Sequence, residues 1–242
     1  MNLLSKTLCA AVLSVVGVMS SAQAATQVIG TRVVYPASER EVSVRVINSG
    51  TDPRLIQAWV DSGNESETAE TSKAPFMINP PLSRIDAGKG QTFRLMFTGG
   101  SVPQDRESVF WLNVVEVPTK PQAKDGTENF LQFAVRTRIK IFYRPTTLVG
   151  DLESSVAQLS WKFTHKDGKP AVTCINNTAY NVSMGDVRLK GSSPRDSVAG
   201  GGMCPAKGSE TFVVDGPDSG TVAYTVIDDY GAMAQHESPY TH

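Results

Sequence analysis

The sequence is poor in the residues that build catalytic and metal sites. Among its 242 residues there are three histidines and three cysteines. It lacks the patterns of a serine-hydrolase nucleophile elbow, a zinc-protease helix and a phosphate-binding P-loop. The histidines, His165, His236 and His242, have no nucleophile or carboxylate at a telling spacing, and each is typical of a surface residue. We therefore predict no catalytic residue and no cofactor.

The sequence also lacks an excess of positive or negative charge, and this limits the classes of partner to be expected. The chain has 23 Lys and Arg against 24 Asp and Glu, a formal net charge of −1. This balance argues against nucleic acid or an anionic membrane as the main partner. The adjacent carboxylates Asp228 and Asp229 are weak candidates for a hard cation, because neighbours on a strand point to opposite faces. We expect no metal site.

The one long apolar run lies at the start of the chain. Leu8–Met19 is too short to cross a bilayer as a helix. It follows Lys6 and precedes Ala22–Ala24, an A-x-A cleavage site, which together indicate an export signal. We expect residues 1–24 to be removed by cleavage after Ala24, and residues 25–242 to be exported without membrane insertion, most simply to a bacterial periplasm.

Cysteine is scarce, and its placement is informative. Cys9 falls in the export signal, so Cys174 and Cys204 remain in the mature chain. In an oxidising compartment such a pair usually forms one disulfide. The bridge would close a loop of roughly thirty residues, worth about 3–4 kcal/mol in the chain-entropy model. Two buried free thiols are the other interpretation of the pair.

Long helical periodicity is missing, and alternation of apolar and polar residues takes its place. In Glu41–Ile47 the valines alternate with Ser43 and Arg45, which is typical of a half-buried strand. Short strands in two sets, joined after Pro145, predict two β-sandwich domains over residues 25–147 and 148–242. The expected strands are Thr26–Tyr35, Glu41–Ile47, Leu55–Asp61, Gln91–Phe97, Ser108–Val117, Phe130–Tyr143, Leu159–Thr164, Ala171–Ile175, Asn181–Leu189, Glu210–Val214, Thr221–Asp228 and Ala234–Tyr240.

The stretch Asn129–Pro145 predicts an unusually long strand. Leu131, Phe133 and Val135 form one apolar edge, and the alternation resumes around Lys140. A mean strand has about five or six residues. A strand of this length either holds its own domain together or is offered to a partner.

Several segments resemble those of periplasmic pilus chaperones, the PapD-like family. Ile139–Pro145 (IKIFYRP) resembles the signature that closes the first domain of these proteins. The further matches are Thr31–Pro36 (TRVVYP), Asn79–Leu82 (NPPL), Pro103–Asn113 (PQDRESVFWLN), Asn176–Tyr180 (NNTAY) and Asp228–Gly231 (DDYG). The family usually has Asn-Pro-Thr-Pro-Tyr at the fourth of these, and this chain lacks the two prolines. The resemblance implies an all-β fold of two immunoglobulin-like sandwiches in an L-shaped arrangement.

The resemblance also implies a function without enzymatic activity. Such chaperones bind, fold and cap pilus subunits by donor-strand complementation, a known case of β-strand addition, and deliver them to an outer-membrane usher. By motif, Arg32 and Lys140 would grip the C-terminal carboxylate of the subunit. Leu131, Phe133 and Val135 would be the donor side chains. The other interpretation is that these three fill the core of their own domain.

Two structural features follow from the same resemblance. Glu107, Arg144 and Asp229 match a charge triad that fixes the angle between the domains. The loop Val117–Asn129 is short and has no cysteine, which resembles the short-loop class serving rod-like adhesive pili. The expected Cys174–Cys204 disulfide would therefore staple the second domain.

Other classes of protein predict different features. A two-domain surface adhesin or structural pilus subunit would need neither the Arg32 and Lys140 pair nor a bare donor strand, and it would lie outside the cell. A periplasmic sugar-active enzyme would need two carboxylates in a cleft, and no such pair stands out in the sequence. A self-capping homodimer, in which two copies cover each other's donor edge, is a further partner hypothesis.

Overall fold

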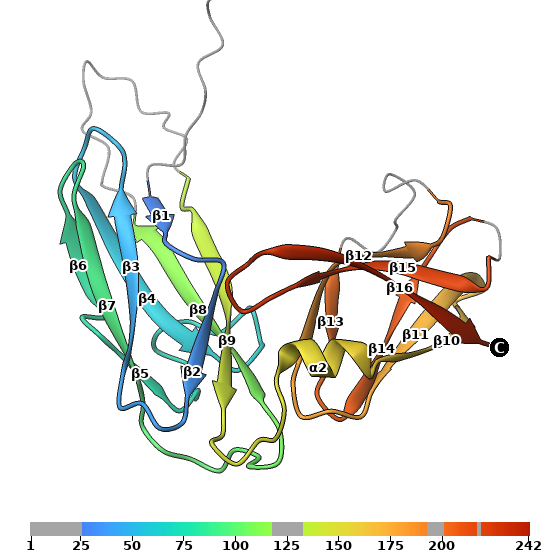
Figure 1. The fold of residues 1–242 in the computed structure, drawn as a ribbon. Helices are drawn as coiled ribbons and strands as arrows, with labels where there is room; N and C mark the ends of the chain where they lie inside the picture. The colour runs from blue at the N-terminus through green and yellow to red at the C-terminus, as the bar shows by residue number, and fades with distance from the viewer. Residues whose placement is uncertain (1–25, 118–132, 193–200, 217–218) are drawn as a thin grey trace, which may run out of the picture.

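The computed structural model describes residues 26–117, 133–192, 201–216 and 219–242. It consists of two β-sandwich domains that meet at an angle (Figure 1). The turn between the last two strands of the second domain reaches the first domain beside β2 and β9 (Figure 1). The fold is therefore the pair of sandwiches that the alternating sequence predicts.

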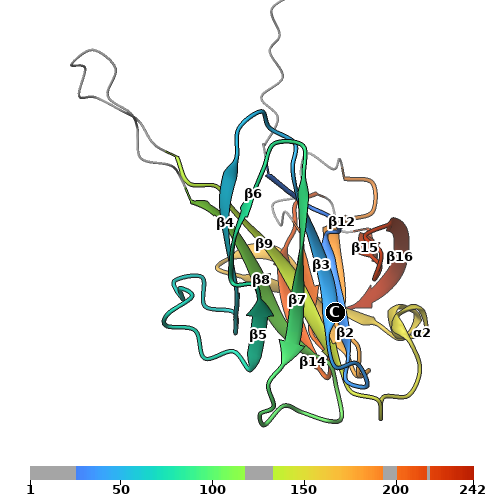
Figure 2. The ribbon, with the colours of Figure 1, turned by 90° about the vertical axis from the view of Figure 1, so that its left-hand side faces the viewer.

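The first domain packs two sheets face to face (Figure 2). One sheet has the order β1-β3-β7-β5 and the other β2-β9-β8-β4-β6. The strands are β1 (Thr26–Val28), β2 (Arg32–Pro36), β3 (Val42–Asn48), β4 (Arg54–Asp61), β5 (Phe76–Asn79), β6 (Leu82–Ile85), β7 (Gly90–Phe97), β8 (Ser108–Val117) and β9 (Arg136–Arg144). The alternating residues Val44 and Val46 of β3 belong to the same hydrophobic core cluster as Ile139 and Ile141 of β9.

In the part that the structure describes, the second domain has one short helix and seven strands in the order β13-β12-β15-β16-β10-β11-β14. Its elements are α2 (Leu152–Ala157), β10 (Ser160–Lys166), β11 (Lys169–Asn176), β12 (Val182–Leu189), β13 (Gly202–Cys204), β14 (Gly208–Val213), β15 (Thr221–Ile227) and β16 (Met233–Thr241). Asp151 caps the helix, because its side chain accepts a hydrogen bond from the Ser154 amide at 2.7 Å. A disulfide joins Cys174 of β11 to Cys204 of β13, both fully buried.

Two strand predictions were wrong in extent. Thr26–Tyr35 is not one strand: β1 pairs with β3 in one sheet, and β2 pairs with β9 in the other. The chain changes sheet at Ile29–Thr31, where Gly30 has φ +102°, a value that favours glycine. The long strand begins only at Arg136, although the Val135 carbonyl still accepts a bond from the Glu116 amide at 3.0 Å.

Three short elements were not predicted from the sequence. α2, β6 and β13 have six, four and three residues, too few to show a period. The Asn79-Pro80 peptide bond, between β5 and β6, is cis. The export signal and Leu131 lie outside the described residues.

Candidate functional site in the interdomain cleft

Two basic residues lie opposite each other at the junction of the domains. Arg32 begins β2 and Lys140 lies in β9, and the parallel pairing of these strands places the two residues in register. The Arg32 Nη1 donates to the Ile227 carbonyl at 2.9 Å. Among the described residues, the hydrogen bonds of the Lys140 Nζ are long, 3.4 Å to the Gly202 carbonyl and 3.5 Å to the Ser183 hydroxyl. Both side chains therefore extend from the first domain toward the second.

Both cations are partly buried. Burial lowers the pKa of Arg32, although Asp229 and Asp228 act in the opposite direction. Burial, with a smaller contribution from the charge of Arg32, lowers the pKa of Lys140 to about 8. The Arg32 Nε is buried and has no hydrogen-bond partner among the described residues. A carboxylate placed here would supply the missing acceptor and relieve the repulsion between the two cations.

Lys140 opens into a cleft shared by the two domains. Its ammonium lies 5.6 Å from the centroid of the Trp111 ring. The cleft has a volume of about 520 Å³, with Trp111 and Lys140 on its first-domain side. The second domain contributes the segments Gly201–Met203 and Glu210–Val213, together with Lys166.

One edge of β9 is open next to this pair. β9 pairs with β8 from Arg136 to Tyr143, but with β2 only from Lys140 onward. Among the described residues, no strand pairs with the second edge of residues 136–139. Phe133 and Val135, just before β9, are 74% and 53% exposed, so they lie outside the core of the first domain. Their neighbours in the alternation, Ile139 and Ile141, are buried in it.

A charge cluster ties the domains together beside the cleft. The Arg144 Nε donates to Glu107 at 2.6 Å, and its two terminal nitrogens donate to Asp229 at 2.9 and 3.1 Å. Burial alone would lower the pKa of Arg144, but its bonds to Asp229 and Glu107 raise that pKa above the ordinary value. Because β15 ends at Ile227, the same turn brings Asp229 to Arg144 and the Ile227 carbonyl to Arg32.

Sequence reasoning missed Asn181. Its backbone amide donates to the second oxygen of Glu107 at 2.8 Å, and its side-chain oxygen accepts from the Ala206 amide at 2.9 Å. Asn181 therefore links the charge cluster to the segment just after Cys204. The only signal was its position directly after the Asn176–Tyr180 motif. Ser183 and Gly202 were also missed, because the bonds that they accept from Lys140 cross between domains.

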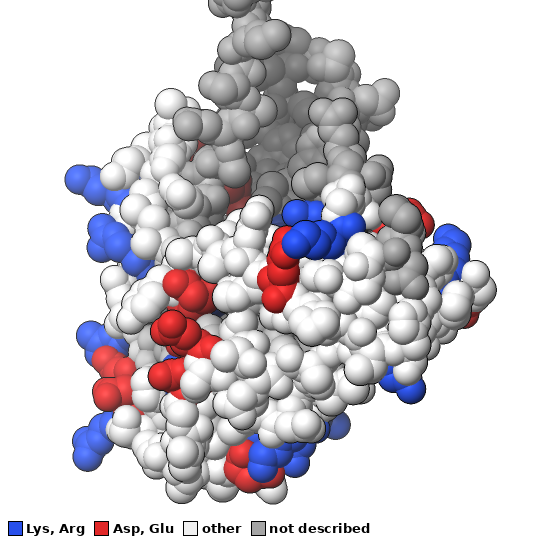
Figure 3. All heavy atoms as spheres, turned by 45° about the vertical axis from the view of Figure 1, so that its right-hand side comes forward, with Lys and Arg blue, Asp and Glu red and all other residues white. Residues whose placement is uncertain are grey.

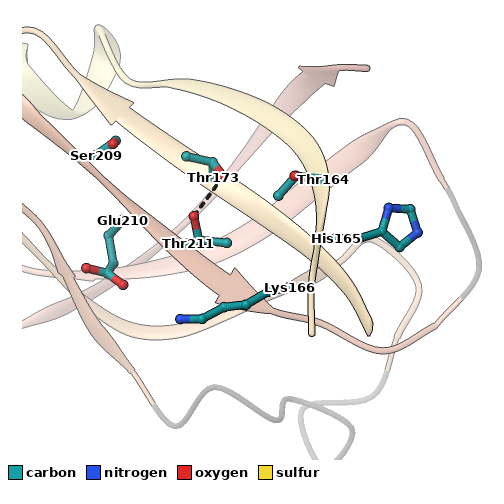
Figure 4. Close-up of a pocket in the computed structure, with 7 residues that line it drawn as sticks. All are labelled: Thr164, His165, Lys166, Thr173, Ser209, Glu210 and Thr211. Atoms are coloured by element: carbon teal, nitrogen blue, oxygen red, sulfur yellow. Dashed lines mark hydrogen bonds between the residues drawn. The ribbon is translucent and has the colours of Figure 1, made fainter. Parts of the chain in front are cut away.

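The second domain also carries a shallow polar hollow of about 380 Å³ (Figure 4). It is lined by Thr164, His165, Lys166, Thr173, Ser209, Glu210 and Thr211. Thr173 and Thr211 hydrogen-bond each other at 2.9 Å, while His165 lies away from both (Figure 4). The His165 ring instead packs against the edge of Phe163, with centroids 5.5 Å apart. The hollow offers a set of hydroxyls but no nucleophile activated by a base.

Other ligand classes find little support in the described part of the chain. No group of three or more His, Cys, Asp or Glu residues there is placed to hold a metal ion. No helix in it is both long and apolar enough to cross a membrane. Acidic and basic side chains are interspersed on the face shown in Figure 3, so it carries no broad field of one sign.

Comparison with known proteins identifies the family. Residues 25–149 match the pili and flagellar-assembly chaperone PapD N-terminal domain, and residues 154–238 match the pili assembly chaperone PapD C-terminal domain. The chain belongs to the PapD family of pili assembly chaperones. The sequence motifs favoured a pili assembly chaperone over a surface adhesin. The similar proteins described next favour it as well.

The relatives cover nearly the whole chain. The probable fimbrial chaperone YadV of Escherichia coli K12 is 39% identical over 222 residues, which is 89% of this chain and 90% of that protein. The chaperone FimB/FhaD of Bordetella pertussis is 36% identical over 90% of this chain and 89% of its own length. The crystal structure of the Pseudomonas aeruginosa CupB2 chaperone is 34% identical, with a TM-score of 0.72 over 88% of this chain and 100% of that one.

One similar structure contains a pilin. The complex of the Salmonella enterica SafA pilin with the SafB chaperone gives a TM-score of 0.75 at 27% identity, covering 90% of this chain and 96% of the matched chain. The fold of two immunoglobulin-like sandwiches is thus shared with solved pili assembly chaperones.

Proposed function

We propose that this chain is a periplasmic chaperone that binds pilus subunits in the interdomain cleft, completes their sheet with its own strand and hands them to an outer-membrane usher. Residues 1–24 act as the export signal, with cleavage after Ala24. Residues 25–147 bind the subunit through β9, and residues 148–242 form the other wall of the cleft. No chemical step is required of the chaperone, because capping is a binding event.

The observation that carries the proposal is where the open edge of β9 ends. A strand added to this edge in the direction of β9 would be collinear with β2, since β2 also runs parallel to β9. It would have to stop where β2 begins, at Arg32. A chain terminus placed there meets the Arg32 guanidinium and the Lys140 ammonium. Two desolvated cations at a strand end favour a terminal carboxylate over a continuing chain.

The segment before β9 supplies the donor side chains in this proposal. Phe133 and Val135 are exposed and apolar, and they share the alternation of Ile139 and Ile141. Leu131 continues the same series outside the described residues. Strand addition would place these side chains in the groove of a subunit that lacks one strand. Their burial on binding would provide the apolar contribution, while the cleft cations set the register.

Release of the subunit requires no nucleotide in this proposal. A better-fitting donor strand from the next subunit would replace the chaperone strand at the usher.

The short-loop subclass rests on the resemblance of Val117–Asn129, most of which lies outside the described residues. In the absence of subunit, two chaperones would cover each other's open edge as a self-capping homodimer, because an unpaired edge invites pairing.

Capture from the periplasm of the source bacterium tests the function. Tagged wild-type chain, Lys140→Ala and the control Arg84→Ala, whose side chain is 70% exposed, are purified and their partners identified by mass spectrometry. We expect the wild type and the control to retain exported subunits in near-equal molar amounts, and Lys140→Ala to lose them. Equal recovery in all three would remove Lys140 from the site. No subunit in any of them would overturn the chaperone function.

A further inference from the structure

Two arginines lie on the outer face of β9, directly before Lys140. Arg136 and Arg138 alternate with Thr137 and the buried Ile139, so their side chains leave the sheet on the side opposite to the core. Both reach across β8 to Asp61 at the end of β4, two strands away. Arg136 lies 3.5 Å from Asp61 at its nearest nitrogen, and Arg138 lies 2.7 Å away.

Asp61 is a completely buried carboxylate with several donors. It accepts two bonds from Arg138, at 2.7 and 3.1 Å. The Asn113 side chain and the Gly63 amide each donate to it at 2.7 Å. Burial acts to raise the pKa of Asp61, but these bonds outweigh it and lower the pKa below the ordinary value. The residue is therefore ionised in the periplasmic pH range.

The remaining guanidinium donors are also engaged. Arg136 donates to the Asn113 side chain at 2.8 Å and to the Glu65 carbonyl at 2.7 Å. Arg138 donates to the Glu65 carboxylate at 3.0 Å. The loop after β4 is thus bound to the same two arginines.

Two indole rings complete the arrangement. Arg136 lies 5.0 Å from the ring centroid of Trp59 on β4, and Arg138 lies 4.1 Å from that of Trp111 on β8. Each guanidinium is fixed by a carboxylate network and by an aromatic face, a combination that suits arginine rather than lysine. Trp111 also lines the interdomain cleft, so the network extends to the edge of the candidate site.

The residues held in this way belong to the part of β9 with an open edge. Residues 140–143 are paired on both sides, but residues 136–139 are paired with β8 alone. A strand segment with one partner opens locally more readily than one with two. Strand addition needs this segment already extended, because ordering it during binding would weaken association.

We propose that Asp61 is a positioning residue: through Arg136 and Arg138 it holds residues 136–139 extended and ready for subunit pairing. Asp61 itself does not touch the subunit. The inference rests on the proposed function, in that the strand to be added is that of a pilus subunit. In this proposal Arg136 and Arg138 fix the geometry of the strand, and Lys140 binds the carboxylate.

Hydrogen exchange of the free protein tests the positioning role directly. In Asp61→Asn the shape is kept and the charge is lost. We expect the amides of residues 136–139 that bond to β8 to exchange about tenfold faster than in the wild type. The exchange rates of the amides of residues 141–143 should change by less than about twofold. Glu65→Ala removes an 80% exposed carboxylate outside the core, and we expect it to give the same pattern more weakly. Asp86→Asn, from an exposed pair with Arg84, is the matched control.

Binding kinetics separate positioning from general destabilisation. The probe is the subunit that co-purifies with the wild type, and its association is measured at equal fraction of folded chaperone. We expect Asp61→Asn to slow association by about fivefold to tenfold and Asp86→Asn to leave it unchanged. The preference of the chaperone for a free over an amidated C-terminus should persist in Asp61→Asn.

The two failures are distinguishable. Unchanged protection at residues 136–139 in both Asp61→Asn and Glu65→Ala would overturn the positioning role, and so would unchanged association. If the wild type itself does not prefer the free carboxylate, the proposed anchor fails, and hydrogen exchange still decides the role of Asp61.

Discussion

Arg32 and Lys140 lie side by side on neighbouring parallel strands, at the point where β2 begins and the open edge of β9 ends. Neither cation has a carboxylate bonded to it within the described residues, although Asp228 and Asp229 act on Arg32 at longer range. Their nearest acceptors are a carbonyl for Arg32, and a carbonyl and a hydroxyl for Lys140. The pair is therefore arranged for an anion that arrives with a strand.

The pH dependence of subunit binding should follow Lys140, whose pKa is about 8 in the free protein. A bound carboxylate raises that pKa, so binding takes up a proton above pH 8. We expect affinity to be constant below pH 8 and to fall by up to about tenfold per pH unit above it. Isothermal titration of the co-purified subunit across this range measures the effect, and Lys140→Arg should abolish the fall. A flat profile in the wild type would contradict this role of Lys140.

Removal of the Lys140 charge should stabilise the free chaperone. Lys140→Met keeps an unbranched side chain that is one atom shorter, and it removes a partly buried cation next to Arg32. We expect the melting temperature at pH 7 to rise by a few degrees while subunit binding is lost, a trade between stability and function. The gain should shrink as pH rises from 8 toward the ordinary lysine pKa, since the folded wild type has then lost its charge. A lower melting temperature at pH 7 would show that Lys140 supports the fold instead.

Arg144 should hold the angle between the domains. Arg144→Ala leaves Glu107, which is 4% exposed, without its guanidinium partner, and we expect a loss of about 3 kcal/mol in the free energy of unfolding. Small-angle scattering should show a wider range of interdomain angles. Arg106→Ala, which removes an exposed pair with Asp105, is the control and should change neither quantity. An unaltered scattering curve and melting temperature for Arg144→Ala would refute the assignment.

Asn181 should contribute to stability through its side chain. In Asn181→Ala the Ala206 amide loses its acceptor in a buried setting, while the bond from the backbone of residue 181 to Glu107 remains. We expect a loss of about 1–2 kcal/mol by chemical denaturation. The exposed neighbour Asn177, changed to Ala, should have no measurable effect. Equal stability of the two variants would mean that water replaces the lost acceptor.

The strands could be predicted from the sequence because a period of two reports which face is buried. Val44 and Val46 lie in the core as their alternation indicates, and so do Ile139 and Ile141. The break of Thr26–Tyr35 into two sheets could not be predicted, since both halves have the same local composition and only their partners differ.

Part of the candidate site could be predicted, and the rest depends on contacts between distant strands. Arg32, Lys140 and the Glu107, Arg144 and Asp229 set were named from motifs, and the structure brings each set together. Asp61 and Arg138 are 77 positions apart and meet only through the order of β4, β8 and β9. A single sequence carries no local signal for such a pair.

The central claim is that the cleft binds the terminal carboxylate of a pilus subunit. It is tested most directly by measuring the affinity of wild type and Lys140→Ala for the co-purified subunit, prepared with a free and with an amidated C-terminus. We predict that the wild type binds the free form at least about tenfold more tightly, and that Lys140→Ala loses most of that preference. Equal affinity of the wild type for the two forms would contradict the account.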